Sequence, residues 1–143
     1  MYDRILLPTD GSDGAADALT HAIEEANAHD AELHVLSVAD ERVFLAAKAD
    51  EKAEISAELN AEANDAVEAL AARAAEADVD VTTAVREGVP YRQILQYAED
   101  EGIDLLVLGT HGRTGRERRI NLGSTTERVV KAANQPVLVV NIE

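Results

Sequence analysis

The chain has 143 residues, of which 46% are hydrophobic, and 28 Asp and Glu against 13 Lys and Arg give a formal net charge of −15. This length predicts a single domain, residues 1–143, with one core. The lack of cysteine excludes disulfides and thiol chemistry, and the negative charge argues against nucleic acid as a partner. No apolar run fits a signal peptide or a membrane span, so we expect a cytoplasmic protein with no membrane partner. The spread-out acidic residues are typical of a halophilic protein.

The first half of the chain alternates short apolar runs with helical patterns. The pattern predicts a strand over residues 2–8 and a helix that begins at residue 12 or 13 and ends near 29. A second strand is expected over residues 32–38. A stretch without a clear pattern follows to about Lys52, and apolar residues at helical spacing then predict a long helix to about Ala77.

The second half repeats this alternation. A third strand is expected over 79–86, and Pro90 suits the first position of a helix to Glu101, which Gly102 closes in a left-handed cap. The remaining elements are an apolar strand, a helix and a last strand, over residues 103–109, 124–134 and 136–142.

This order predicts an α/β fold, a three-layer open parallel sheet of five strands with helices on both faces. If the first strand is central, with order 3-2-1-4-5, the strand order reverses between strands one and four. Ligands bind at such a reversal, beyond the carboxyl ends of the strands. The loops that meet there are PTDGS, residues 8–12, and GTHGRTGRERRINLGST, residues 109–125.

The second of these loops concentrates positive charge and glycine. Residues 105–135 hold six basic and two acidic residues, net +4, so the rest of the chain carries −19. Gly109, Gly112 and Gly123 would let backbone N–H groups approach a phosphate, and a helix N-terminus beginning at Ser124 would attract it. The alternative is a surface loop closed by a capping box, in which Ser124 and Glu127 bond each other's backbone N–H groups.

Asp10 ends the first strand beside the same crevice. It suits a hydrogen bond to a ribose or a hydrated Mg²⁺, and equally a turn in which Asp bonds its own backbone. His111 is a candidate ligand contact, whereas His21, His29 and His34 fit structural or surface roles. Nucleophile-elbow, P-loop, HExxH and GxGxxG motifs are all missing, so no residue is assigned as catalytic or as a metal ligand.

Together these features resemble the universal stress protein family over nearly the whole chain. The resemblance is carried by PTDGS after the first strand, GTHGRTG after the fourth, Gly-Ser at the start of the last helix, and the closing PVLVV. It implies a Rossmann-like fold of the adenine nucleotide alpha hydrolase-like type, ATP binding in one branch, and a homodimer. The dimer would form through the last strand, at Pro136, Val137, Leu138, Val139 and Val140.

The resemblance also implies a nucleotide site. Asp10 would contact the ribose or adenine end, the backbone near Val38 would meet the adenine, and the glycine loop would hold ribose and phosphates, with Mg²⁺ bridging the phosphates. The predicted cofactor-binding residues are Pro8, Thr9, Asp10, Val38, Gly109, His111, Gly112, Arg113, Gly123, Ser124 and Thr125.

One departure from the family keeps several functions open. The family's ATP motif is G-x2-G-x9-G-[ST], whereas ten residues separate Gly112 from Gly123 here. The leading hypothesis is a non-catalytic, ATP-binding stress-response module that acts as a dimer. The alternatives are a slow ATP hydrolase and a dimeric interaction protein that no longer binds nucleotide.

Overall fold

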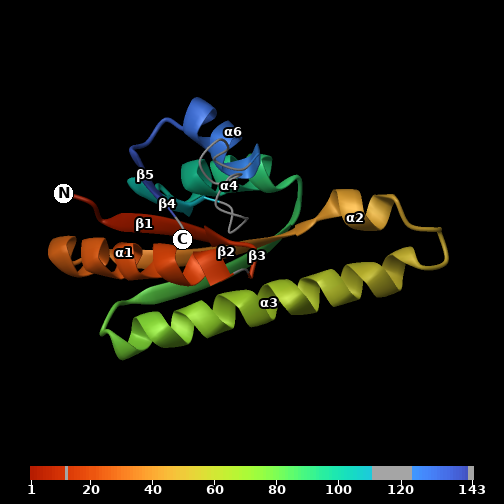
Figure 1. Ribbon diagram of the computed structural model, residues 1–143, viewed down its shortest axis with the longest axis horizontal. Helices are drawn as coiled ribbons and strands as arrows, with labels where there is room; N and C mark the ends of the chain where they lie inside the picture. The colour runs from red at the N-terminus through yellow and green to blue at the C-terminus, as the bar shows by residue number, and fades with distance from the viewer. Residues whose placement is uncertain (12, 111–123, 142–143) are drawn as a thin grey trace.

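The computed structural model describes residues 1–11, 13–110 and 124–141. Five parallel strands form one sheet in the order β3-β2-β1-β4-β5, which confirms the predicted topology (Figure 1). The strands are β1 (Arg4–Thr9), β2 (Glu32–Asp40), β3 (Val81–Gly88), β4 (Leu105–Gly109) and β5 (Val137–Val140). The helices are α1 (Asp13–His29), α2 (Glu41–Leu45), α3 (Lys52–Glu76), α4 (Pro90–Asp100) and α6 (Ser124–Ala132).

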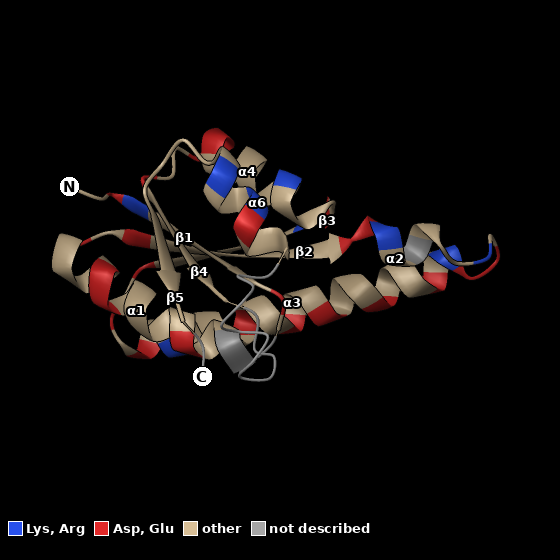
Figure 2. Ribbon diagram, turned by 45° about the horizontal axis from the view of Figure 1, so that its top comes forward, with Lys and Arg blue, Asp and Glu red and all other residues tan. Residues whose placement is uncertain are grey.

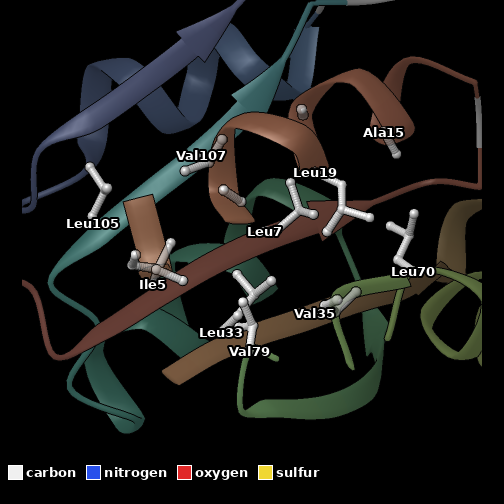
Figure 3. Close-up of a cluster of buried hydrophobic side chains, with 14 of the residues drawn as sticks. Ile5, Leu7, Ala15, Leu19, Leu33, Val35, Leu70, Val79, Leu105 and Val107 are labelled. Atoms are coloured by element: carbon white, nitrogen blue, oxygen red, sulfur yellow. The ribbon is translucent and has the colours of Figure 1, made fainter. Parts of the chain in front are cut away.

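Alternation along the central strands divides the core between the two faces of the sheet. On one face, Ile5, Leu7 and Val107 pack in a cluster with α1 and α3 (Figure 3). On the other face, Leu6 and Leu106 pack with α4 and α6. Helices cover both faces of the parallel sheet, so the central strands are buried on both sides. This explains the continuous apolar runs from which the sequence predicted these strands.

The element boundaries differ from the predicted ones by about two residues, for local reasons. β2 extends past Val38 because its pairing with β3 continues to Asp40 and Gly88. β1 begins at Arg4, two residues late, since the Asp104 carboxylate accepts the backbone N–H groups of Asp3 and Arg4, at 2.8 and 3.0 Å. The unassigned stretch before Lys52 contains α2. The predicted left-handed cap at Gly102 is confirmed by its φ of 62°.

One buried polar contact joins β2 to α4. His34 is 3% exposed and Tyr97 is 4% exposed, and His34 Nδ1 lies 2.6 Å from Tyr97 Oη. His34 Nε2 lies 2.5 Å from a Glu32 carboxylate oxygen, although this contact lacks hydrogen-bond geometry. Burial of the phenol raises the pKa of Tyr97, so the hydroxyl keeps its proton for this bond.

Replacing Tyr97 with Phe is expected to destabilise the fold by about 1–3 kcal/mol, because the ring is kept while His34 Nδ1 loses its buried partner. Urea unfolding followed by circular dichroism measures the change. Tyr91→Phe is the control, because the Tyr91 hydroxyl bonds an exposed arginine, Arg92, and its loss should change the unfolding free energy little. Equal stability of Tyr97→Phe and the native chain would contradict the prediction.

Candidate functional site

A cavity of about 430 Å³ lies at the carboxyl ends of β1, β2 and β4, where the strand order reverses. The starts of α4 and α6 and one side of α3 complete its wall. The lining residues include Pro8, Thr9, Asp10, Ser37, Val38, Asp40, Arg42, Leu59, Glu62, Ala63, Pro90, Gly109, Ser124, Thr125 and Thr126. The cavity volume falls within the range typical of small-ligand sites.

The crevice opens because the pairing of β1 stops before the strands end. β1 pairs with β4 only at Ile5 and Leu6, and its pairing with β2 ends at Thr9 and Ser37. β2 continues to Asp40 along β3 alone. Beyond Ser37, β2 therefore pairs with a strand on one edge only. On its other edge, the backbone N–H and C=O groups face the cavity.

The turn after β1 directs Asp10 to the cavity rim. Thr9 is 8% exposed, and its hydroxyl accepts the Gly11 N–H at 3.0 Å. Gly11 has a φ of 83°, in the left-handed region that favours glycine. Thr9 thus supplies a hydrogen bond to this turn, and Asp10 is exposed and lines the cavity.

The start of α6 is fixed over the end of β4. The Thr126 hydroxyl donates to the Gly109 carbonyl at 2.9 Å, so the first turn of the helix faces the cavity. A helix start offers free N–H groups and a partial positive charge to an anion. The capping box, the alternative role of these residues, does not form between the described residues Ser124 and Glu127. The Glu127 carboxylate instead accepts from Lys131 at 2.9 Å, the neighbour one turn later on the helix.

The described cavity wall is acidic. It contains the carboxylates of Asp10, Asp40 and Glu62 and the guanidinium of Arg42, which gives a net charge of −2. Arg42 forms a two-pronged ion pair with Asp40, at 2.9 and 2.7 Å. This hydrogen bonding holds the pKa of Asp40 below its usual range, so the pair persists at neutral pH. Arg42 is therefore already neutralised within the protein.

The model of the Universal stress protein family matches residues 1–141. The chain belongs to this family. Among its relatives, Universal stress protein MJ0531 of Methanocaldococcus jannaschii is 43% identical over 98% of this chain and 82% of its own length.

Solved structures of the family agree with the fold. The structure of MJ0577, also a universal stress protein of M. jannaschii, is 36% identical, with a TM-score of 0.87 over all of this chain and 98% of that one. A universal stress protein solved in complex with cAMP is 25% identical, with a TM-score of 0.74 over 97% of each chain.

The structure brings most of the predicted site residues together in this universal stress protein. Seven of them line the cavity: Pro8, Thr9, Asp10, Val38, Gly109, Ser124 and Thr125. They come from three strand ends and one helix start. The other four, His111, Gly112, Arg113 and Gly123, lie outside the described residues.

Sequence reasoning missed the part of the wall that comes from β2, α2 and α3. Asp40 and Arg42 belong to it because β2 runs farther than predicted, and Leu59, Glu62 and Ala63 because α3 passes under the cavity. The helical spacing of Leu59 and Ala63 indicated that this face of α3 is buried, but it did not indicate that part of the face lines a cavity. Within residues 1–11, 13–110 and 124–141, no helix has the length and apolarity to cross a membrane.

Proposed function

We propose that this universal stress protein binds an adenine nucleotide, with ATP as the leading candidate, in the cavity at the ends of β1, β2 and β4. The protein then acts as a non-catalytic binding module. The observation that carries the proposal is the convergence of Asp10, Val38, Gly109 and Ser124 on one cavity, although they stand far apart in the sequence. The universal stress protein solved with cAMP supports this ligand class.

The cavity wall suggests how the nucleotide lies. The backbone of β2 near Val38 offers the donors and acceptors that suit the edge of a purine base. Asp10 suits a hydrogen bond from a ribose hydroxyl, and the first turn of α6 suits a phosphate. The ligand then runs from β2 across the end of β1 to α6.

Magnesium would enter with the phosphates. Within the described part of the chain, no group of three or more His, Asp or Glu side chains could hold a metal ion. Mg²⁺ commonly combines one or two carboxylates with phosphate oxygens and water. Asp10 is the carboxylate of the cavity lining that fits this role, because it follows β1, the sheet neighbour of β4, over whose end α6 begins.

A second function is favoured by the acidic wall. A net charge of −2 on the described lining opposes a triphosphate, which favours a dimeric interaction protein that has lost nucleotide. Mass spectrometry of small molecules that co-purify with the native protein separates the two functions. An adenine nucleotide at near-stoichiometric amounts supports the first, and its absence together with no binding of added ATP supports the second.

Replacing Asp10 with Ala is expected to weaken ATP binding roughly 10- to 100-fold, the effect of losing one charge-assisted hydrogen bond. Isothermal titration with ATP and Mg²⁺ measures it. Asp17→Ala removes the same charge from an exposed position on α1 and should leave the affinity unchanged. Absence of heat from the native protein at millimolar ATP would contradict the proposal as a whole.

We also propose that the module is a homodimer through β5. This strand is an edge of the sheet, and Val137, Leu138 and Val139 on it are only partly buried. An apolar edge strand is prone to pair with another chain, and a second copy related by a two-fold axis satisfies both edges at once.

A further inference from the structure

Two arginines converge on one tyrosine where α4 and α6 pack side by side. The Arg128 guanidinium lies 4.8 Å from the ring centroid of Tyr91, and that of Arg92 lies 5.6 Å away. Arg92 Nε also donates to the Tyr91 hydroxyl at 3.0 Å. Hydrogen bonding to Arg92, with a smaller effect of Arg128, lowers the pKa of Tyr91. The three side chains, called the Tyr91 cluster below, form a local concentration of positive charge.

The two arginines of the Tyr91 cluster have no carboxylate within ion-pairing distance among the described residues. Arg42, Arg86 and Lys131 each have one, at 2.7, 3.2 and 2.9 Å. Glu41 acts on Arg92, and Glu127 on Arg128, only through longer-range attraction. Arg4 and Arg73 likewise have no carboxylate within ion-pairing distance among the described residues, but Arg92 and Arg128 differ from them by lying around one ring. Two guanidinium groups in one place leave charge available for an anion from outside.

The cluster adjoins the cavity through both of its helices. Tyr91 directly follows Pro90, and Arg128 stands four residues after Ser124, on the same side of α6. Pro90 and Ser124 both line the cavity. Figure 2 shows Lys and Arg beside Asp and Glu on α4 and α6, whereas the charged residues of α1 and α3 are almost all Asp and Glu. A ligand that leaves the cavity between α4 and α6 would thus meet arginine.

We propose that Arg92 and Arg128 form a clamp for a phosphate group, which lies farther from the base than the phosphate at the start of α6. This inference rests on the proposed function and deepens it, because it makes the site selective for nucleotides with several phosphates. Guanidinium groups bind phosphate oxygens in pairs, and the Tyr91 hydroxyl adds a donor. The clamp also supplies the positive charge that the described wall of the cavity lacks.

The phosphate has two sources, the chain of a bound nucleotide or a free polyphosphate, and the experiment separates them. Isothermal titration compares AMP, ATP and inorganic tripolyphosphate on the native chain and on the Arg92→Gln, Arg128→Gln double variant. The expected result is an ATP affinity lower by about tenfold or more in the double variant, with an AMP affinity changed less than about twofold. Lys131→Gln is the control, since it also removes a cation from α6, but one that Glu127 already pairs.

The titration with tripolyphosphate distinguishes a failure of the clamp proposal from a failure of the nucleotide proposal. Tripolyphosphate that binds the native chain and not the double variant supports the clamp even if no adenine nucleotide binds, and the nucleotide proposal then fails alone. ATP that binds equally well to the native chain and the double variant overturns the clamp and leaves the nucleotide proposal standing. If neither ligand binds the native chain, both proposals are overturned.

Discussion

Replacing Ala63 with Phe is expected to lower the affinity for ATP by at least about 100-fold while the protein stays folded. Ala63 is 5% exposed, yet it belongs to neither core cluster and lines the cavity from α3. A ring at this position therefore enters the cavity that we assign to the nucleotide. Over-packing costs about 1–3 kcal/mol even in a filled core, and less is expected where the ring meets open space.

Titration calorimetry with ATP measures the loss, and circular dichroism during thermal unfolding confirms that the variant folds. Ala57→Phe is the matched control, because residue 57 lies on the same helix and is exposed. A folded Ala63→Phe protein that binds ATP as tightly as the native chain would show that the nucleotide lies elsewhere. A variant that fails to fold is replaced by Ala63→Leu, for which a smaller loss in the same direction is expected.

The strands and their order could be predicted because the signals are local and strong. Ile103 to Gly109 is almost wholly apolar, as a strand buried on both faces must be, and Pro90 and Gly102 delimit the helix before it. The strand ends were less predictable because residues far away in the sequence set them. Asp104 holds the start of β1, and Gly88 on β3 holds the end of β2.

The candidate site was predictable where it follows from strand topology. Asp10, Val38 and Gly109 stand at three strand ends, which a parallel sheet brings to one edge. The residues that α3 contributes could not be predicted from topology, because the packing of α3 against the sheet determines where Glu62 and Ala63 lie relative to the strand ends. Two local bonds were also hard to predict: Thr9 supplies a hydrogen bond to the turn at Asp10, and Glu127 pairs with Lys131 rather than forming the alternative capping box. In each case several local partners were available to one polar group.

The acidic wall changes how the basic loop of the sequence is understood. The described lining carries −2, and its guanidinium, Arg42, is held by Asp40. Apart from the partial charge at the start of α6, attraction of a polyphosphate must therefore come from charged side chains outside this lining. The Tyr91 cluster is one source, and the arginines of 113–119, which lie outside the described residues, would be another. Salt should weaken such attraction, because exposed charges are screened over about 10 Å at 0.1 M.

Replacing Val139 with Pro is expected to weaken the proposed homodimer at least about 30-fold without unfolding the protein. The carbonyl groups of Pro136 and Val140 accept hydrogen bonds from the N–H groups of Leu106, on β4, and Thr110, directly after it. Because backbone groups alternate sides along a strand, those of Val137 and Val139 point to the open edge. Proline at 139 therefore removes a donor from the edge and spares the ladder to β4. By two-fold symmetry each lost bond counts twice, at about 1 kcal/mol each.

Sedimentation equilibrium at several salt concentrations measures this effect. Each chain carries a formal charge of −15, so two copies repel at low salt and the native dimer should tighten as screening increases. The loss of dimer affinity caused by Val139→Pro should persist at every salt concentration, because the substitution removes hydrogen bonds and changes no charge. A control, Thr83→Pro, alters an exposed position on the opposite edge strand, β3, and should leave dimerisation unchanged if it folds. A native chain that stays monomeric at high salt would contradict the homodimer, and a Val139→Pro chain that dimerises as tightly as the native chain would place the partner surface elsewhere than on β5.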